Sequence, residues 1–210
     1  DLRMSRGLGD VYKRQEQKEQ GVRLLATGEM GIGNTTTSSA VACALLSRGA
    51  AEMTGRGAGL SQEGLRRKIQ VVEQALSKNQ PDPKDPLDVL SKVGGFDIAG
   101  LCGVFLGGAI YGVPVLVDGF ISSIAALCAV QMCPKAEKAV LASHVSAEPA
   151  GQMVLDALGR QPLITAGMRL GEGTGAVAAI PLLDMACAVY QESYTFEQGG
   201  IEPYVPLGDS

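Results

Sequence analysis

Two glutamates framed by glycines are the residues of this chain best suited to chemistry. Glu29 lies in the turn G-E-M-G-I-G-N-T-T-T at residues 28–37, and Glu172 lies in G-E-G-T-G at residues 171–175. Glycines let the backbone approach a ligand closely, and the helix predicted after each turn offers unpaired N–H donors. The first turn therefore suits a phosphate, with Glu29 directed at hydroxyls or a cationic ring, and a partly desolvated Glu172 suits a general base. Alternatively, each is an ordinary helix start whose glutamate favours the helix dipole.

The spacing of the first turn excludes two familiar nucleotide loops. Gly28 and Gly33 are placed as in a Walker loop, but Asn34 stands where that loop needs its lysine. The dinucleotide fingerprint G-x-G-x-x-G is not matched either, because the order here is G-x-x-G-x-G. A small-molecule kinase or NTPase is an alternative that Mg²⁺-dependent ATP binding would favour. The missing lysine predicts no such binding.

Alternating strand and helix patterns predict an α/β fold. Strands are expected at residues 22–26, 113–117 and 139–142, and helices at 36–47, 64–77, 96–111, 122–132, 150–158 and 171–190. This order predicts a parallel sheet with helices on both faces, a Rossmann-like three-layer arrangement. Ligands of such sheets bind beyond the carboxyl ends of the strands, so the loops at 28–35, 118–120 and 143–148 are expected to converge on one cavity.

The composition indicates a globular protein that binds no nucleic acid. The 210 residues are 46% hydrophobic and carry a formal net charge of −4, without a basic stripe of interleaved aromatics. The uncharged run 98–117 is long enough to cross a bilayer, but Y-G-V-P at 111–114 splits it and no Lys/Arg cluster flanks it. A buried helix followed by a strand is preferred to a membrane span, and no membrane partner is expected.

The cysteines and the histidine do not indicate a metal centre. Cys43, Cys102, Cys128, Cys133 and Cys187 lie on apolar stretches without paired spacing, which is typical of reduced core cysteines in a cytoplasmic protein. Cys128 and Cys133 could form a metal pair, but His144 is the only histidine and no acidic cluster accompanies them. No metal is expected.

Taken together, the two glutamate turns resemble a known family. They are similar to the corresponding segments of the nicotinate-nucleotide:dimethylbenzimidazole phosphoribosyltransferase family, which makes the lower-ligand nucleoside phosphate of cobalamin. Further similar segments follow in the same order from about residue 21 to the end: T-G-R-G at 54–57, R-K-I at 67–69, G-F-D-I-A at 95–99, V-D-G-F-I-S at 117–122, S-H-V-S-A-E at 143–148 and P-L-L-D at 181–184.

The resemblance implies transfer of a 5-phosphoribosyl group from nicotinate mononucleotide to a benzimidazole base, without a cofactor. It implies Glu172 as the catalytic base, Glu29 for the ribose or the cationic pyridine, and Lys68 for the phosphate or a carboxylate. Read from the sequence alone, Lys68 would instead lie on a solvated helix face. Further substrate-binding positions are implied at Gly31, Gly33, Gly57, Gly119, Ser146, Gly171 and Gly173.

Four polar residues near these motifs have supporting interpretations. Asp97, Asp118 and Arg169 could support the site, although a helix cap or a salt bridge explains them equally well. His144 is expected to be a hydrogen-bonded structural residue rather than a catalyst.

The resemblance also implies a missing part. The family has an N-terminal helical region that contributes to the benzimidazole pocket, and nothing before Gly21 resembles it. Residues 1–15 resemble translated adapter read-through and are expected to be a non-native leader, which leaves a single domain at 16–210. The family further implies a homodimer. Activity is expected of the longer protein, whereas this chain could instead be a non-catalytic nucleotide- or phosphate-binding module or an inactive fragment.

Overall fold

The structure, a computed structural model, describes residues 18–202, so the suggested leader at 1–15 lies outside the described residues. The chain divides into two compact units, Asp1–Ala179 and Ile180–Ser210. All three strands of the described residues and all the predicted site residues lie in the first unit. The candidate site therefore belongs to the first unit alone.

The sheet of the first unit has three parallel strands, as predicted. β1 (Leu25–Ala26), β2 (Val115–Val117) and β3 (Val140–Ala142) lie side by side in chain order, with Leu25 opposite Val115 and Val115 opposite Val140. Every residue of β2 is fully buried, as expected for the centre of a parallel sheet. Beyond β3, His144 bridges in parallel to Ile164, so the backbone at 163–164 continues the sheet by one position.

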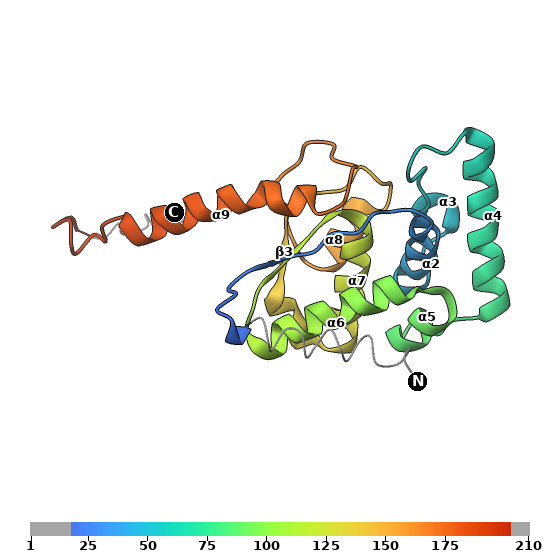
Figure 1. Ribbon diagram of the computed structural model, residues 1–210, viewed down its shortest axis with the longest axis horizontal. Helices are drawn as coiled ribbons and strands as arrows, with labels where there is room; N and C mark the ends of the chain where they lie inside the picture. Colours follow the sequence, from blue (N-terminus) through green and yellow to red (C-terminus); the bar gives the residue numbers. More distant parts are fainter. Residues whose placement is uncertain (1–17, 203–210) are drawn as a thin grey trace, which may run out of the picture. The chain divides into compact units, whose positions relative to one another are not determined.

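Helices account for most of the described chain (Figure 1). The predicted helices are all present, as α2 (Asn34–Leu46), α4 (Gln62–Asn79), α6 (Phe96–Tyr111), α7 (Gly119–Met132), α8 (Gly151–Ala157) and α9 (Thr174–Glu192). Three short ones were missed: α3 (Ala50–Met53), α5 (Pro86–Val93) and the 3-10 helix η1 (Pro134–Ala139). α2 packs against α4, α5 and α7, while α6 packs against α7 and η1.

Local signals explain one of the missed helices, α5. Asp85 accepts hydrogen bonds from the N–H groups of Leu87 and Asp88, and Pro86 occupies the first helical position, where its missing N–H costs nothing. The proline-rich segment 81–86 is thus a helix start rather than only a loop. The first long helix, predicted at 36–47, spans Asn34–Leu46, and Gly49 is the N-cap of α3.

The alternative of a membrane span at 98–117 is wrong. α6 ends at Tyr111, and Gly112 takes a left-handed conformation with φ 66°, with its N–H bonded to the carbonyl of Gly108. The chain then folds back so closely that a Cβ on Gly108 would lie 2.7 Å from the carbonyl oxygen of Val113. The run is therefore a helix and a sheet strand, as preferred from the sequence.

α9 is the one helix within residues 18–202 that is long and apolar enough, by length and composition, to cross a membrane. It continues through Pro181, which lies inside the helix. In the second unit, exposed apolar side chains include Met185, Val189 and Tyr190.

The core is built from small and apolar residues between the sheet and its helices. Phe105, Ile98, Ile124 and Leu127 are among its largest fully buried side chains. Cys43, Cys102 and Cys128 are buried and reduced, and burial raises the pKa of the Cys43 thiol to about 11 and that of Cys102 to about 12. The expectation that all five cysteines lie in the core is wrong for Cys187, which is exposed. Cys133 is only partly buried.

Candidate functional site

The two glycine-framed turns lie backbone against backbone. The N–H of Glu172 donates to the carbonyl oxygen of Glu29 at 3.0 Å. A Cβ on Gly28 would lie 2.6 Å from the backbone nitrogen of Gly173, closer than any side chain tolerates. Glycine is therefore required at position 28 by the approach of the second turn, although the two turns are more than 140 residues apart in sequence.

The two glutamate side chains are held differently. Glu29 is half-buried, and its Oε2 accepts a hydrogen bond of 2.7 Å from the N–H of Gly31 in the same turn. Glu172 has a left-handed backbone with φ 57°, unusual for a residue other than glycine, and its side chain is exposed rather than partly desolvated. The strained backbone of Glu172 is sustained by the contacts of its neighbours.

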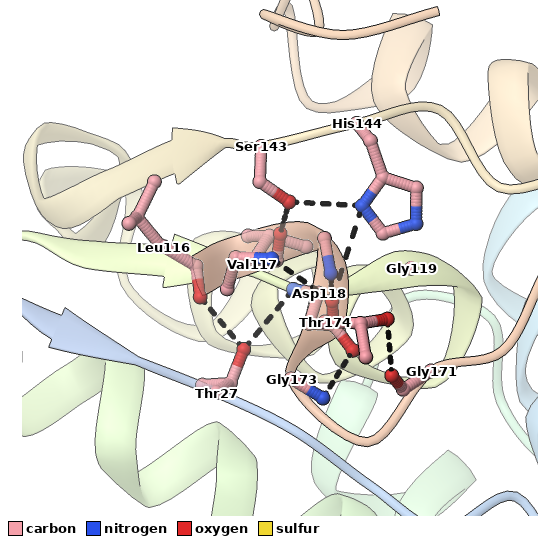
Figure 2. Close-up of polar contacts among 12 residues, drawn as sticks. Thr27, Leu116, Val117, Asp118, Gly119, Ser143, His144, Gly171, Gly173 and Thr174 are labelled. Atoms are coloured by element: carbon pink, nitrogen blue, oxygen red, sulfur yellow. Dashed lines mark hydrogen bonds and ion pairs between the residues drawn. The ribbon is translucent and has the colours of Figure 1, made fainter. Parts of the chain in front are cut away.

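Asp118 holds the second turn in place (Figure 2). Its buried carboxylate accepts three backbone hydrogen bonds at the start of α9: from Gly173 at 2.8 Å, from Gly175 at 2.8 Å and from Ala176 at 3.0 Å. By position Asp118 is the N-cap of α7, yet its side chain makes no capping bond to that helix. The interpretation of Asp118 as a helix cap is thus confirmed, but the helix that it caps is α9, which is distant in sequence. The N-terminus of α7 has no side-chain cap.

A small polar network supports Asp118 from the ends of the strands. The hydroxyl of Thr27, directly after β1, donates to the carbonyl of Leu116 at 2.7 Å and accepts from the N–H of Asp118 at 3.2 Å. Ser143, directly after β3, donates its hydroxyl to the carbonyl of Val117 and lies 3.0 Å from Nδ1 of His144. These bonds fix the three strand ends relative to one another (Figure 2).

The strand-end loops converge, as predicted, on one cavity. This carboxylate cavity takes residues from the loops after β1, β2 and β3 and from the second glycine turn; it is lined by Glu29, Met30, Gly31, Thr35, Gly57, Ala58, Asp118, Gly119, Phe120, Ile121, His144, Ser146, Glu148, Arg169, Leu170 and Gly171. Three carboxylates face one cation, Arg169. Such a lining favours hydroxyl and cationic groups over anions.

A second hollow adjoins it and has the opposite charge. This cation hollow shares Gly31, Thr35 and Ala58 with the carboxylate cavity, and it is lined by Gly31, Ile32, Gly33, Thr35, Thr36, Arg56, Ala58, Gly59, Leu60 and Lys68. It contains two cations, no carboxylate, and the N-terminus of α2, where Gly33 is the N-cap without a side-chain bond. These features favour an anion.

Lys68 is buried, so the interpretation as a solvated helix face is wrong for this residue. Its ammonium group donates to the hydroxyl of Thr35 at 2.8 Å and to the carbonyl of Gly55 at 3.0 Å. Burial lowers the pKa of Lys68, while the charge of Glu148 opposes that shift. Its neighbours Arg66 and Arg67 are exposed, as predicted.

Comparison with known proteins identifies the family. A family model described as phosphoribosyltransferase matches residues 11–201. The chain belongs to this phosphoribosyltransferase family. It is 55% identical over 192 residues to the nicotinate-nucleotide–dimethylbenzimidazole phosphoribosyltransferase of Acetivibrio thermocellus, a match that spans 91% of this chain and 55% of that protein. The protein of the same name from Clostridium acetobutylicum is 53% identical over 193 residues, 92% of this chain and 55% of that protein.

Solved structures agree with this membership of the phosphoribosyltransferase family. The crystal structure of CobT from Thermus thermophilus superimposes with a TM-score of 0.87 at 40% identity, covering 95% of this chain and 60% of that chain. The chain thus spans little more than half the length of the relatives it matches. The activity of the full-length relatives therefore applies to this shorter chain only as a proposal.

The structure brings most of the predicted phosphoribosyltransferase site together. Six predicted residues line the carboxylate cavity: Glu29, Gly31, Gly57, Gly119, Ser146 and Gly171. Gly33 and Lys68 line the adjoining cation hollow. Glu172 and Gly173 line neither, although both neighbour Gly171 in the second turn. Of the supporting residues, Arg169 lines the cavity, and Asp97 accepts a hydrogen bond of 2.6 Å from Asn34 at the start of α2.

Sequence reasoning assigned no contact to Glu148, which lines the carboxylate cavity. Its Oε1 accepts from the N–H of Gly57 at 3.0 Å, and its Oε2 is buried without a hydrogen-bond partner among the described residues. Gly55 has no room for a Cβ, which would lie 1.7 Å from that oxygen. Glu148 and Lys68 thus hold the same glycine loop from two sides. The motif S-H-V-S-A-E contained this signal, since its glutamate follows a strand end.

No metal-binding group of three or more His, Cys, Asp or Glu side chains occurs within residues 18–202. Cys128 is buried in the core and burial raises its pKa, which disfavours the thiolate that a metal needs. His144, the only histidine, bonds through Nδ1 to Ser143, in agreement with the expected structural role.

Proposed function

We propose that the protein transfers the 5-phosphoribosyl group of nicotinate mononucleotide to 5,6-dimethylbenzimidazole, giving α-ribazole 5′-phosphate and nicotinate. The observation that carries this proposal is the direct backbone contact between the two glutamate turns. It brings a loop suited to a ribosyl phosphate donor beside a carboxylate suited to a base. The names of the relatives support the same reaction.

The opposite charges of the two hollows suggest how the donor binds. The phosphate would occupy the cation hollow, near Lys68, Arg56 and the N-terminus of α2. The ribose and the cationic pyridine would then lie in the adjoining carboxylate cavity, where Glu29 attracts positive charge and accepts hydrogen bonds from hydroxyls. This orientation places the anomeric carbon on the side of the second turn.

In the proposed reaction the benzimidazole nitrogen forms a bond to the anomeric carbon as the bond to nicotinate breaks. The leaving pyridine nitrogen is already cationic and takes back the bonding electrons, so it needs no acid. The acceptor must lose its N–H proton, which Glu172 would take. The exposed side chain on a glycine-framed turn can reach an incoming base, and a positioned general base contributes about 10² to 10⁴ in rate.

We infer that the acceptor base is held largely by residues outside this chain. The chain spans about 55% of the length of its relatives, and the exposed Glu172 is not among the residues that line either hollow. The chain alone would then bind nicotinate mononucleotide but turn over poorly, which is the binding-module alternative. A homodimer, a cytoplasmic location, and helices on both faces of the sheet in a Rossmann-like three-layer arrangement belong to the same proposal.

Replacing Glu172 by Gln in the full-length protein tests the proposed chemistry. Formation of α-ribazole phosphate should fall by about 10² to 10⁴, while the dissociation constant for nicotinate mononucleotide stays within about twofold. Glu73→Gln, which removes an exposed carboxylate from α4, is the matched control and should change neither. Retained turnover in Glu172→Gln would contradict the base, and a wild-type protein that binds the nucleotide without any turnover would favour the binding module.

A further inference from the structure

His144 lies in the carboxylate cavity in a fixed orientation. Its side chain is only 2% exposed, and it follows Ser143 at the end of β3. Gly175 packs against the ring so closely that a Cβ there would lie 1.9 Å from Nδ1. On the other side, Nε2 lies near Gly119, where an added Cβ would be 3.5 Å away. The ring therefore has little freedom to turn.

The hydrogen bonds around Nδ1 decide which ring nitrogen carries the proton. Ser143 has one hydroxyl proton and donates it to the carbonyl oxygen of Val117, which can only accept. The serine oxygen must then accept from His144, so Nδ1 carries a hydrogen over the 3.0 Å contact. The carboxylate of Asp118, with Oδ1 3.9 Å from Nδ1, favours the same tautomer.

Burial favours the neutral form of the ring, and in that form Nε2 is an acceptor. The net effect is a lowered pKa for His144, because burial outweighs the opposing charge of Asp118. The other charged side chains that line the cavity are Glu29, Glu148 and Arg169. Among the described residues, Nε2 has no hydrogen-bond partner.

The geometry points to His144 Nε2 as the acceptor for a sugar hydroxyl of the bound phosphoribosyl donor, which makes His144 a specificity-determining residue. A phosphate oxygen has no hydrogen to donate when fully ionised, so it does not pair with a bare Nε2. A ribose hydroxyl does. This inference rests on the proposed function, and it assigns one group of the donor to one atom of the protein.

Nitrogen NMR of the single imidazole tests the inference without any mutation, because the chain has no other histidine. In the free protein Nδ1 should give the signal of a protonated nitrogen and Nε2 that of an unprotonated one. Ribose 5-phosphate should shift the Nε2 signal in the direction of an accepted hydrogen bond, and inorganic phosphate alone should not. Protonation of both nitrogens on binding, or a response to dimethylbenzimidazole only, would overturn the inference.

Two substitutions convert the assignment into a binding measurement. His144→Asn keeps an amide N–H near the position of Nδ1 and removes Nε2, whereas His144→Gln places an amide near Nε2. Ribose 5-phosphate, 2-deoxyribose 5-phosphate and 3-deoxyribose 5-phosphate are compared by calorimetry. The wild type should bind at least one deoxy sugar about tenfold more weakly than ribose 5-phosphate, and His144→Asn should lose that preference. His144→Gln should retain part of it.

The outcomes separate this inference from the proposed function. If the wild type binds nicotinate mononucleotide and His144→Asn still discriminates against the deoxy sugars, the role of His144 is wrong and the proposed function stands. A wild type that does not discriminate at all would contradict the role of His144 in the same way. If the wild type binds neither nicotinate mononucleotide nor ribose 5-phosphate, the proposed donor site fails, and the inference fails with it.

Discussion

Glu29 and Glu172 occupy similar glycine-framed turns but are held by different means. The first turn is closed by its own carboxylate, since Glu29 accepts the N–H of Gly31. The second turn is held by a carboxylate from elsewhere, Asp118, which accepts the N–H groups at the start of α9. Because Asp118 supports the second turn, the side chain of Glu172 does not have to, and it is left exposed. A carboxylate fixed by a hydrogen bond, which we call tied, suits recognition of a ligand. A carboxylate without such a bond, which we call untied, suits transfer of a proton.

Separating the two turns should have the largest effect. Gly28→Ala places a Cβ 2.6 Å from the backbone of Gly173, and backbone atoms on both sides must move. We expect the free energy of unfolding to fall by about 2–3 kcal/mol and turnover of the full-length protein to be lost. Denaturant unfolding and product formation measure these effects.

Gly33→Ala is the matched control for that change. Gly33 has φ 83° but nothing within 4 Å of an added Cβ, so only backbone strain of about 1 kcal/mol is expected. Gly28 itself has no positive φ, so its loss should come from the contact alone. Equal losses of stability in both variants would show that the contact between the turns contributes no more than the strain of one left-handed residue.

Asp118→Asn should have the next largest effect, because it weakens the support of the second turn alone. The amide cannot accept three hydrogen bonds as strongly as the carboxylate, and its NH₂ group would face an N–H donor. A loss of about 2–3 kcal/mol in the free energy of unfolding is expected. Turnover should fall by a larger factor than the affinity for nicotinate mononucleotide, which is weakened only by the loss of one carboxylate from the cavity lining.

Asp85→Asn gives the comparison for a local, exposed cap. Asp85 caps its own helix α5, and its replacement should cost no more than about 1 kcal/mol. If Asp118→Asn costs no more than Asp85→Asn, or if it weakens nucleotide binding and turnover equally, Asp118 does not act through the second turn.

The strands, the long helices and the convergence of the loops could be predicted from the sequence, because each depends on local patterns and on the rule that parallel strands end at one edge. α6 has the predicted bounds, 96–111, because the sequence Y-G-V-P at 111–114 divides the apolar run where the helix ends. The short helices α3 and η1 could not be predicted in this way, since four to six residues show too little periodicity.

The individual contacts of the site depend on partners far apart in sequence. A capping role for Asp118 could be inferred from its position, but not that it caps α9 rather than α7. Lys68 lies outside the apolar stripe of its helix, and its buried ammonium group bonds to Thr35 and to the loop at Gly55, both distant in sequence. Glu148 belongs to a recognisable motif but had no predicted role, because its bond to Gly57 spans 91 positions.

Glu29→Gln should have the smallest effect of the three and test the first turn. The amide oxygen can still accept the N–H of Gly31, so the turn should keep its shape, while the negative charge is lost. We expect the dissociation constant for nicotinate mononucleotide to rise about fivefold, since the charged pyridine loses an attraction of about 1 kcal/mol. Ribose 5-phosphate, which has no cationic ring, should be affected less. If Glu29→Gln instead abolished turnover as completely as Glu172→Gln, with nucleotide affinity unchanged, the two turns would share the chemistry, and the division between a tied and an untied carboxylate would be wrong.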